Sequence, residues 1–444
     1  MDQRRFFCSG ARRARSDQWG SGELGSGCAA PVGSRWPTQC LPASGLLAAD
    51  GHTEGPHPPG GAVGERSGPL EALVSGSSGM LSREFWAHRR VLVTGHTGFK
   101  GSWLALWLLS LRAEVWGYSL PPEPGRCLFS ELDLVKAVAH ADWGNLYHHL
   151  ADLRDLEALK RVVVEAQPEV VLHLAAQPLV RRSYRDPLAT WATNVQGSLN
   201  LLEALMPLKH RCAVVMVTTD KVYANQEWDY GYREGDQLGG HDPYSASKAA
   251  AELGISSWRA SFCGPGSHQT PYLQIATARA GNVIGGGDWA EDRIVPDAMR
   301  ALAAGESIPV RHPSATRPWQ HVLEPLGGYL LLAERLATAG HVYASAFNFG
   351  PSLDANRSVR QLVEAALQHW PGDWRDLSDP AAPHEAGRLH LQIDKAHHQL
   401  GWQPHWDFTT TVARTVAWYR DVHEGARPLD CCLVDLEAYG ACGR

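Results

Sequence analysis

Tyr244 and Lys248, at the two ends of the segment Tyr-Ser-Ala-Ser-Lys, are the residues whose types and spacing point most directly to chemistry. On a helix, side chains four positions apart share one face and lie about 5–6 Å apart at Cβ. A phenol titrates near 10, and a neighbouring ammonium that lowers its pKa to about 7 must favour the anion by roughly 4 kcal/mol. Such a pair could take a proton from a hydroxyl group while a hydride leaves the same carbon. The alternative is an exposed helix face, because a lone match of this kind also occurs by chance.

A glycine-rich segment, Thr-Gly-His-Thr-Gly-Phe-Lys-Gly at 94–101, lies between a predicted strand and a predicted helix. Gly95 allows a tight turn, Gly98 lets the backbone approach a pyrophosphate, and Gly101 lets the helix pack on the strand. The helix N-terminus adds free N–H groups and positive potential. In this context the segment predicts dinucleotide binding rather than a purely structural turn.

The residues near this segment leave the choice of dinucleotide open. The second predicted strand ends in Tyr118-Ser119-Leu120, with no carboxylate for a ribose and no arginine cluster for a 2′-phosphate. The residues alone therefore do not separate NAD from NADP. Asp152 is placed either to meet the adenine or to cap a helix. Lys100 either contacts a phosphate or is solvated.

Strands and helices alternate through the middle of the chain. The predicted strands lie at 90–94, 114–118, 169–174 and 213–217, and the predicted helices at 101–111, 153–166 and 194–205. This alternation implies βαβ units and a parallel sheet. The expected fold is α/β, a Rossmann-type doubly wound parallel sheet with a smaller, interleaved C-terminal substrate-binding lobe. The expected boundaries are a dinucleotide-binding domain at 81–270, the second lobe at 271–425 and a loose tail at 426–444.

The first 79 residues differ in composition from the rest. They are rich in Gly, Ser, Pro, Ala and Arg, show no helical or strand period, and contain no Lys, Ile, Tyr or Asn. We expect this segment to be disordered. Since the four missing residue types all have A/T-rich codons, we hypothesise that the segment is a GC-rich upstream leader read as protein and that the natural start is Met80. A genuine disordered extension is the alternative.

Composition excludes several classes of function. A formal charge of −6 over 444 residues gives no electrostatic reason to propose a nucleic-acid partner. The longest strongly apolar run, Trp103 to Leu111, is far shorter than the roughly 20 residues of a membrane helix. The nine cysteines include no C-x-x-C pair, which suits reducing cytoplasm rather than a disulfide framework. The 21 histidines include no H-E-x-x-H, so no metal site is expected.

With these elements assembled, residues 81 to about 420 resemble the extended short-chain dehydrogenase/reductases, and within that superfamily the CDP-glucose 4,6-dehydratases. The segments that carry the resemblance include Val-Thr-Gly-His-Thr-Gly-Phe-Lys-Gly-Ser-Trp and Thr-Thr-Asp-Lys-Val-Tyr, and they lie at 93–103, 175–184, 218–223, 239–248, 279–289 and 317–326. The first 79 residues have no counterpart in the resemblance, whose start matches the run from Met80.

The resemblance implies an internal oxidation, elimination and reduction on CDP-glucose, with tightly held NAD returned to its starting state. Tyr244 would take the C4 hydroxyl proton as hydride leaves C4, and Lys248 would hold the ribose and lower the pKa of the phenol. Thr219 would hydrogen-bond the C4 oxygen. Asp220 would protonate the departing C6 hydroxyl, for which its pKa must lie well above about 4. Hydride return to C6 would give CDP-4-keto-6-deoxyglucose.

Lys221 marks a departure within the superfamily. Related hexose dehydratases that act on other nucleotides carry Glu at this position, as the base for C5. The CDP-glucose dehydratases resemble this chain in carrying lysine. A neutral lysine could take the C5 proton, a charged one could stabilise the enolate, and a structural pairing with Asp220 is the plain alternative.

The remaining site residues are carried over from the resemblance. The expected cofactor contacts are Gly95, Thr97, Gly98, Phe99, Gly101, Asp152, Leu153, Ala175 and Ala176, together with Tyr244 and Lys248. The expected substrate contacts are Ser183, Asn282, Arg293 and Arg317. Trp289 and Trp319 are either core aromatics or platforms for the cytosine, and Asn194 is expected to tie a helix to the sheet.

Three other functions fit parts of this pattern. Another nucleotide-sugar 4,6-dehydratase would share these residues apart from Lys221, where such enzymes carry Glu. A 4-epimerase of the same architecture needs the tyrosine and lysine but no acid for C6, so Asp220 and Lys221 argue against it. A non-catalytic dinucleotide-binding sensor would be expected to lose Tyr244 or Lys248. The resemblance further implies a homodimer formed through two helices of the dinucleotide lobe, and a product that feeds deoxysugars of cell-surface polysaccharide such as the lipopolysaccharide O-antigen.

Overall fold

The computed structural model describes residues 81–139, 142–264, 266–267, 270–378 and 388–440. All of them belong to one compact unit. The predicted disordered extension at 1–79 and the hypothesised start at Met80 lie outside the described residues.

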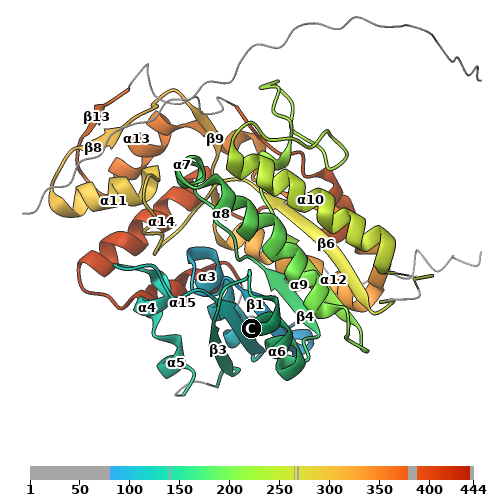
Figure 1. Cartoon of the computed structure of the whole chain (residues 1–444). Coiled ribbons are helices and arrows are strands. Elements are labelled where there is room, and N and C mark those ends of the chain that lie inside the picture. The colour runs from blue at the N-terminus through green and yellow to red at the C-terminus, as the bar shows by residue number, and fades with distance from the viewer. Residues whose placement is uncertain (1–80, 140–141, 265, 268–269, 379–387, 441–444) are drawn as a thin grey trace, which may run out of the picture. The chain divides into compact units, whose positions relative to one another are not determined.

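A seven-stranded parallel sheet forms the centre of this unit (Figure 1). Its strands lie in the order β11-β6-β5-β4-β1-β2-β3, and every neighbouring pair is parallel. Their bounds are β1 (Arg90–Thr94), β2 (Glu114–Ser119), β3 (Leu146–Leu150), β4 (Val170–His173), β5 (Cys212–Val217), β6 (Leu273–Ala280) and β11 (Ala346–Phe349). The order reverses between β4 and β1, which is where open parallel sheets of this type bind ligands.

Helices pack on both faces of the sheet because its strands are apolar on both sides. On one face, Val91 and Val93 of β1 join a core with α3 (Phe99–Ser110) and α12 (Leu323–Ala339). On the other face, Leu92 of β1 joins a core with α6 (Leu156–Ala166), α9 (Gly197–Leu205) and α10 (Pro243–Phe262). Successive residues of one strand thus serve opposite cores, which confirms the predicted doubly wound α/β sheet.

The remaining elements surround the carboxyl ends of the strands and the C-terminal part of the chain. The helices are α2 (Arg83–Trp86), α4 (Leu128–Leu132), α5 (Leu134–Ala137), α7 (Val180–Arg185), α8 (Pro187–Trp191), α11 (Ile294–Ala304), α13 (Val359–His369), α14 (Phe408–His423) and α15 (Pro428–Ala438). Three small sheets pair β7 (Val283–Ile284) with β10 (Gln320–His321), β9 (Thr316–Pro318) with β12 (Asn356–Ser358), and β8 (Ile308–Val310) with β13 (Trp374–Asp376). A π-helical turn, η1 (Ala192–Gln196), and a 3-10 turn, η2 (Asp220–Val222), lie near the site described below.

The structure differs from the sequence prediction in three places. Strand β3 was not predicted, and its side chains are half-buried or exposed rather than uniformly apolar. Strands β6 and β11 follow residue 270 and belong to the main sheet, which the expectation of an interleaved second lobe allows, although neither strand was predicted individually. The loose tail from 426 is wrong for residues 428–438, because α15 buries Cys432 and Leu436 against the rest of the molecule. Within the described ranges, no helix is long and apolar enough to cross a membrane.

Candidate active site

A cavity of about 1300 Å³ opens at the carboxyl ends of the sheet strands. Residues that directly follow four neighbouring strands line it: Gly95 after β1, Leu174 after β4, Thr218 after β5 and Gly281 after β6. Ligands of open α/β sheets bind in this crevice. All the sequence-predicted site residues except Ser183 line this single cavity.

The glycine loop forms one end of the cavity and needs its glycines for different reasons. Gly95 has φ +78°, and a Cβ there would lie 2.7 Å from the backbone nitrogen of Ala175. A Cβ on Gly101 would lie 2.0 Å from the carbonyl oxygen of Gly95, so α3 could not pack so closely on β1. A Cβ on Gly98 would meet only that oxygen, at 3.4 Å, which is an ordinary contact. Gly98 is exposed on the cavity wall, so the absence of a side chain there leaves the α3 N-terminus open to a ligand.

Polar groups at the ends of β2 and β3 extend this end of the cavity. Thr97 Oγ1 lies 2.7 Å from Ser119 Oγ. The Asp152 carboxylate accepts hydrogen bonds from the backbone and side chain of Arg154, and these bonds hold the pKa of Asp152 below its usual range. The cap of α6 is Asp155, whose carboxylate accepts from Ala158 N at 2.9 Å. Of the two roles open for Asp152, the helix cap is therefore excluded.

Tyr244 and Lys248 lie on the first turns of α10, which begins with a strong cap. The Asp242 carboxylate accepts hydrogen bonds from the backbone nitrogens of Tyr244 and Ser245, both at 3.0 Å, and Pro243 occupies the first helical position. Both side chains of the pair are buried and line the cavity. Lys248 Nζ donates to the carbonyl of Val217, at the end of β5, at 3.4 Å.

The pKa of Tyr244 differs from the sequence prediction. Burial raises it to about 12, although the hydrogen bond with Thr219 acts in the opposite direction. Burial lowers the pKa of Lys248 to about 8. In the protein alone, loss of water acts on the Tyr244 pKa more strongly than the hydrogen bond from Thr219 and the charge of Arg293 do.

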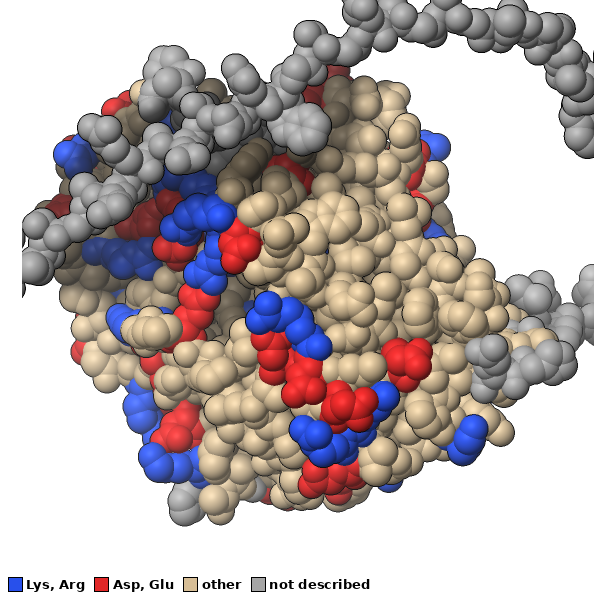
Figure 2. All heavy atoms as spheres, in the orientation of Figure 1, with Lys and Arg blue, Asp and Glu red and all other residues tan. Residues whose placement is uncertain are grey.

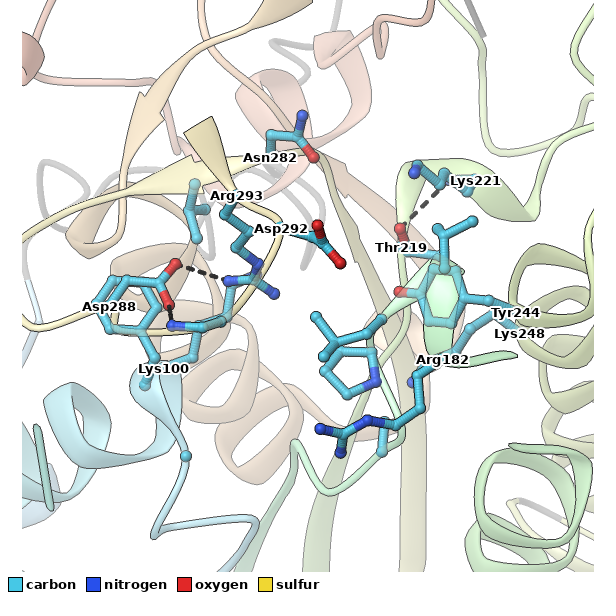
Figure 3. Close-up of a pocket in the computed structure, with 18 of the residues that line it drawn as sticks. Lys100, Arg182, Thr219, Lys221, Tyr244, Lys248, Asn282, Asp288, Asp292 and Arg293 are labelled. Carbon is cyan, nitrogen blue, oxygen red and sulfur yellow. Dashed lines mark hydrogen bonds and ion pairs between the residues drawn. The ribbon is translucent and has the colours of Figure 1, made fainter. Parts of the chain in front are cut away.

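Thr219, Asp220 and Lys221 form the turn that follows β5. Thr219 Oγ1 donates to the Asp220 carboxylate at 2.9 Å and accepts from Lys221 N at 3.4 Å. Burial raises the pKa of Asp220, while the charge of Lys221 and the Thr219 hydroxyl oppose that rise. A carboxyl group with a raised pKa is suited to donate a proton. Figure 3 shows Thr219, Lys221 and Tyr244 on the same side of the cavity.

Lys100, Asp288 and Arg293 lie on the opposite side in Figure 3. Arg293 Nη1 bonds to the Asp288 carboxylate at 2.7 Å, and this charge raises the pKa of Arg293. Lys100 is half-buried on the cavity wall, and burial lowers its pKa to about 8, which favours the phosphate contact over the solvated alternative. Asn282 and Arg317 line the cavity as well. Sequence reasoning missed Asp288, although the Gly-Gly-Gly-Asp-Trp segment was one of those that carried the resemblance.

Ion pairs join α7 to the loop before α11 at the cavity. Arg182 pairs with Glu123 at 2.6 Å and with Glu291 at 3.6 Å. Arg181 pairs with Asp292 at 3.4 Å, and Arg311 also reaches Asp292, at 2.8 Å. We call these six residues the mouth network. Figure 2 shows basic and acidic side chains lying next to one another on the drawn face. The sequence carried no signal for this pairing, because its partners come from distant segments.

Ser183 is the predicted site residue that the structure does not bring to the cavity. It is fully buried, and its hydroxyl donates to the carbonyl of Val180 at 2.7 Å, within α7. Its neighbours Arg182 and Tyr184 line the cavity instead. The prediction of Ser183 as a substrate contact is therefore wrong.

The residues with structural alternatives are also placed. Asn194, in η1, accepts from Gln177 N at 2.8 Å and donates to Ser247 Oγ at 2.9 Å, so it ties the helices to the loop after β4 as expected. Trp319 is buried in the core and Trp289 packs partly against it. Both nevertheless contribute to the cavity wall. The other predicted cofactor contacts, Thr97, Phe99, Leu153, Ala175 and Ala176, line the cavity too.

Comparison with known proteins places this cavity in a family. The family model for GDP-mannose 4,6 dehydratase matches residues 92–415. The chain belongs to this family. Among its curated relatives, the CDP-glucose 4,6-dehydratase of Salmonella typhimurium is 44% identical over 361 residues, which cover 81% of this chain and 98% of the relative. The dTDP-glucose 4,6-dehydratase of Streptomyces antibioticus is 30% identical over 344 residues, covering 76% of this chain and 95% of that protein.

Solved structures agree with this membership. The dTDP-glucose 4,6-dehydratase of Streptomyces venezuelae, determined with NAD bound, superposes with a TM-score of 0.62 at 27% sequence identity. The match covers 76% of this chain and 99% of that one. The match covers almost the whole length of the Salmonella enzyme. The part of this chain without a counterpart in that enzyme is therefore the remainder outside the matched 81%.

Proposed function

We propose that the protein is a CDP-glucose 4,6-dehydratase, a hydro-lyase that converts CDP-glucose to CDP-4-keto-6-deoxyglucose and water. The observation that carries the proposal is the 44% identity over almost the whole length of the Salmonella enzyme. It is supported by the five proposed catalytic residues, which all line one cavity: Thr219, Asp220, Lys221, Tyr244 and Lys248.

The cofactor is NAD, as in the Streptomyces venezuelae relative solved with it. The glycine loop fits this group, since Gly95 and Gly101 let the backbone fold tightly and Gly98 leaves the α3 N-terminus accessible. We assign the adenosine end to Asp152 and Leu153 and the nicotinamide end to Lys248 and Tyr244. When bound there, NAD supplies the acceptor for hydride from C4 and the donor that returns it to C6.

Three residues of the chain move or hold protons in the proposed reaction. Tyr244 takes the proton of the C4 hydroxyl, with Thr219 between it and the carboxylate of Asp220. Oxidation at C4 makes the C5 hydrogen acidic, so that water can be lost across C5 and C6. Asp220 donates the proton to the departing C6 hydroxyl, a role for which its raised pKa is suited.

Lys221 acts on C5 in this proposal. As a free amine it takes the C5 proton, and as an ammonium it stabilises the enolate that forms. Both roles require contact with the sugar, and Lys221 lines the cavity beside Asp220. A Lys221→Ala variant that still oxidises C4 but eliminates water slowly would fit either role. Unchanged turnover would leave Lys221 with only its structural pairing to Asp220.

The substrate diphosphate is assigned to the cationic side of the cavity. Arg293, Arg317 and Lys100 all line this region, and guanidinium groups bind phosphate oxygens in a fork. Asn282 supplies an amide in the loop between β6 and β7. We retain 81–270 as the dinucleotide-binding part and 271–425 as the substrate part of this proposal, with strands of the second part completing the sheet.

We also propose that the protein is a homodimer that works in the cytoplasm and supplies a deoxysugar for cell-surface polysaccharide. Support for the dimer comes from exposed apolar side chains of α8 and α10, namely Leu188, Trp191 and Leu253. Sedimentation of the wild type and of Leu253→Glu tests it: a wild-type monomer, or a variant that stays dimeric, would contradict this interface. Support for the location is the absence of a disulfide spacing among the nine cysteines.

The activity is tested by incubating the purified protein with CDP-glucose and following the alkali-induced absorbance of a 4-keto sugar. The same assay with UDP-, GDP- and dTDP-glucose is the specificity control. Turnover of one of these sugars without turnover of CDP-glucose would overturn the substrate assignment.

A further inference from the structure

A buried carboxylate lies one helical turn beyond Lys248 on α10. Glu252 is 2% exposed, and its oxygens accept four hydrogen bonds. The donors are Thr218 Oγ1 at 2.6 Å, Thr277 Oγ1 at 2.9 Å, and Arg279 Nε and Nη2, both at 2.9 Å. Because a carboxylate offers about four acceptor positions, this anion is fully hydrogen-bonded. The proposed reaction does not use Glu252 or Arg279.

Glu252 and Arg279 together contact both sides of the turn that carries Thr219, Asp220 and Lys221. Thr218 directly precedes the turn and donates to Glu252. Tyr223 follows the turn, and its hydroxyl accepts from Arg279 Nη1 at 2.8 Å. Glu252 and Arg279 therefore hold both ends of the turn against α10, the helix that carries Tyr244 and Lys248.

Glu252 also bears a charge that acts on Lys248. Residues four apart on a helix share a face, and the Glu252 charge opposes the effect of burial on the pKa of Lys248. Burial alone would raise the pKa of Glu252, but the bonds from Arg279, Thr218 and Thr277 hold it below its usual range. The other ionisable groups that face the two residues are Tyr244 and Arg259 on α10, His173 on β4 and Lys100 on α3.

We infer that Glu252, held by Arg279, is a positioning residue: it fixes the turn 219–221 against α10 and places a negative charge beside the Lys248 ammonium. The inference rests on the function proposed above. A buried ion pair is in general a weak source of stability, because the desolvation of both ions offsets their attraction. Its contribution here is the relative placement of two catalytic segments that are far apart in the sequence.

Glu252→Gln tests the inference because it keeps the shape of the side chain and removes its charge. The turnover number should fall roughly 10- to 100-fold while KM for CDP-glucose changes little, because the turn and α10 lose their alignment. The Lys248 ammonium is lost as pH rises through its pKa, and removal of the facing carboxylate lowers that pKa further. The alkaline limb of the turnover profile should therefore move to lower pH by about one unit. A limb that stays in place would overturn the inference.

Thr277→Val is the matched control. It removes one hydrogen bond to Glu252 and keeps the charge, so it should lower the melting temperature without moving the alkaline limb. A limb displaced as far as that of Glu252→Gln would show that packing, not charge, is responsible. Arg279→Lys keeps the positive charge but loses the bidentate hydrogen bond to Glu252. Turnover should therefore fall, while the alkaline limb of its pH profile should stay at the wild-type pH. If Glu252→Gln does not fold, unchanged turnover in Arg279→Lys would overturn the inference.

NAD binding separates this inference from the proposed function. Quenching of tryptophan fluorescence by NAD is measured over a pH series without any nucleotide sugar. Affinity should begin to fall at lower pH in Glu252→Gln than in the wild type, and coincident profiles would contradict the charge effect. If the two pH profiles differ in this way but the wild type does not turn over CDP-glucose, only the proposed function is contradicted.

Discussion

The two ends of the cavity are built in different ways. At the cofactor end, the backbone of the glycine loop and the α3 N-terminus form the surface, and Gly95 and Gly101 are needed because any Cβ would collide with backbone. At the sugar end, hydroxyl, carboxyl and cationic side chains from several elements meet, and burial changes the pKa values of Tyr244 and Asp220. Substitutions at the sugar end should therefore change the chemistry, and those at the cofactor end should change binding and folding.

The largest effect is expected from Tyr244→Phe, which removes the phenol oxygen and keeps the ring. Turnover should fall by about 10³-fold, within the range for loss of a general base, while NAD stays bound. Tyr329→Phe is a matched control, since no group among the described residues bonds to that buried hydroxyl. A loss below about 10-fold in Tyr244→Phe would assign the proton transfer to another group.

Asp220→Asn comes next, because it keeps the shape of the proposed acid but cannot donate its proton. Turnover should fall by about 10²-fold, and mass spectrometry should detect sugar that is oxidised at C4 but not dehydrated. Glu123→Gln, which changes a carboxylate of the mouth network, is the control. Normal dehydration by Asp220→Asn would remove the acid role from this residue.

At the cofactor end, Gly101→Ala and Gly98→Ala form a pair that separates folding from binding. Gly101→Ala puts a Cβ 2.0 Å from a carbonyl oxygen and should destabilise the protein by about 1–3 kcal/mol, measured by denaturant unfolding. Gly98→Ala meets no such obstacle and should keep the stability while weakening NAD binding. Equal stability losses in the two variants would contradict the different roles given to the two glycines.

The smallest effect is expected from Asp152→Ala. The carboxylate is partly exposed and already paired with Arg154, so its loss should weaken NAD binding by less than about 10-fold. Glu157→Ala, which breaks the exposed pair with Lys160 outside the cavity, is the control and should bind NAD normally. A larger loss of NAD affinity in Asp152→Ala would mean that side chains, and not only the backbone of the glycine loop, contribute substantially to binding at the cofactor end.

The cofactor end and the sheet could be predicted because their determinants are local. Val91 to Val93 give a buried strand, and the spacing of Gly95, Gly98 and Gly101 gives the turn after it. Strand β3 was missed because it forms an edge of the sheet and carries no apolar period. Helix α15 was missed because its stability comes from packing of Cys432 and Leu436, which the local pattern does not reveal.

At the sugar end, residue types could be predicted but not their surroundings. The raised pKa of Tyr244 follows from burial between distant segments, and spacing to Lys248 carries no information about that burial. Ser183 was misplaced for a similar reason, since the rotation of α7 about its axis decides which of its residues reach the cavity. Glu252 was missed because its partners Thr218, Thr277 and Arg279 lie elsewhere in the sequence. Asp288 was missed although its partner Arg293 is only five residues away.

The mouth network has a consequence for how fast a ligand enters. Arg182 and Arg181 already pair with Glu123, Glu291 and Asp292, so an arriving diphosphate passes arginines whose charge is largely offset before it reaches Arg293. Added salt weakens the long-range attraction of the anionic ligand, but it also loosens these exposed ion pairs. The two effects oppose each other. The association rate should consequently respond less to ionic strength than it would for a cavity lined by uncompensated arginines.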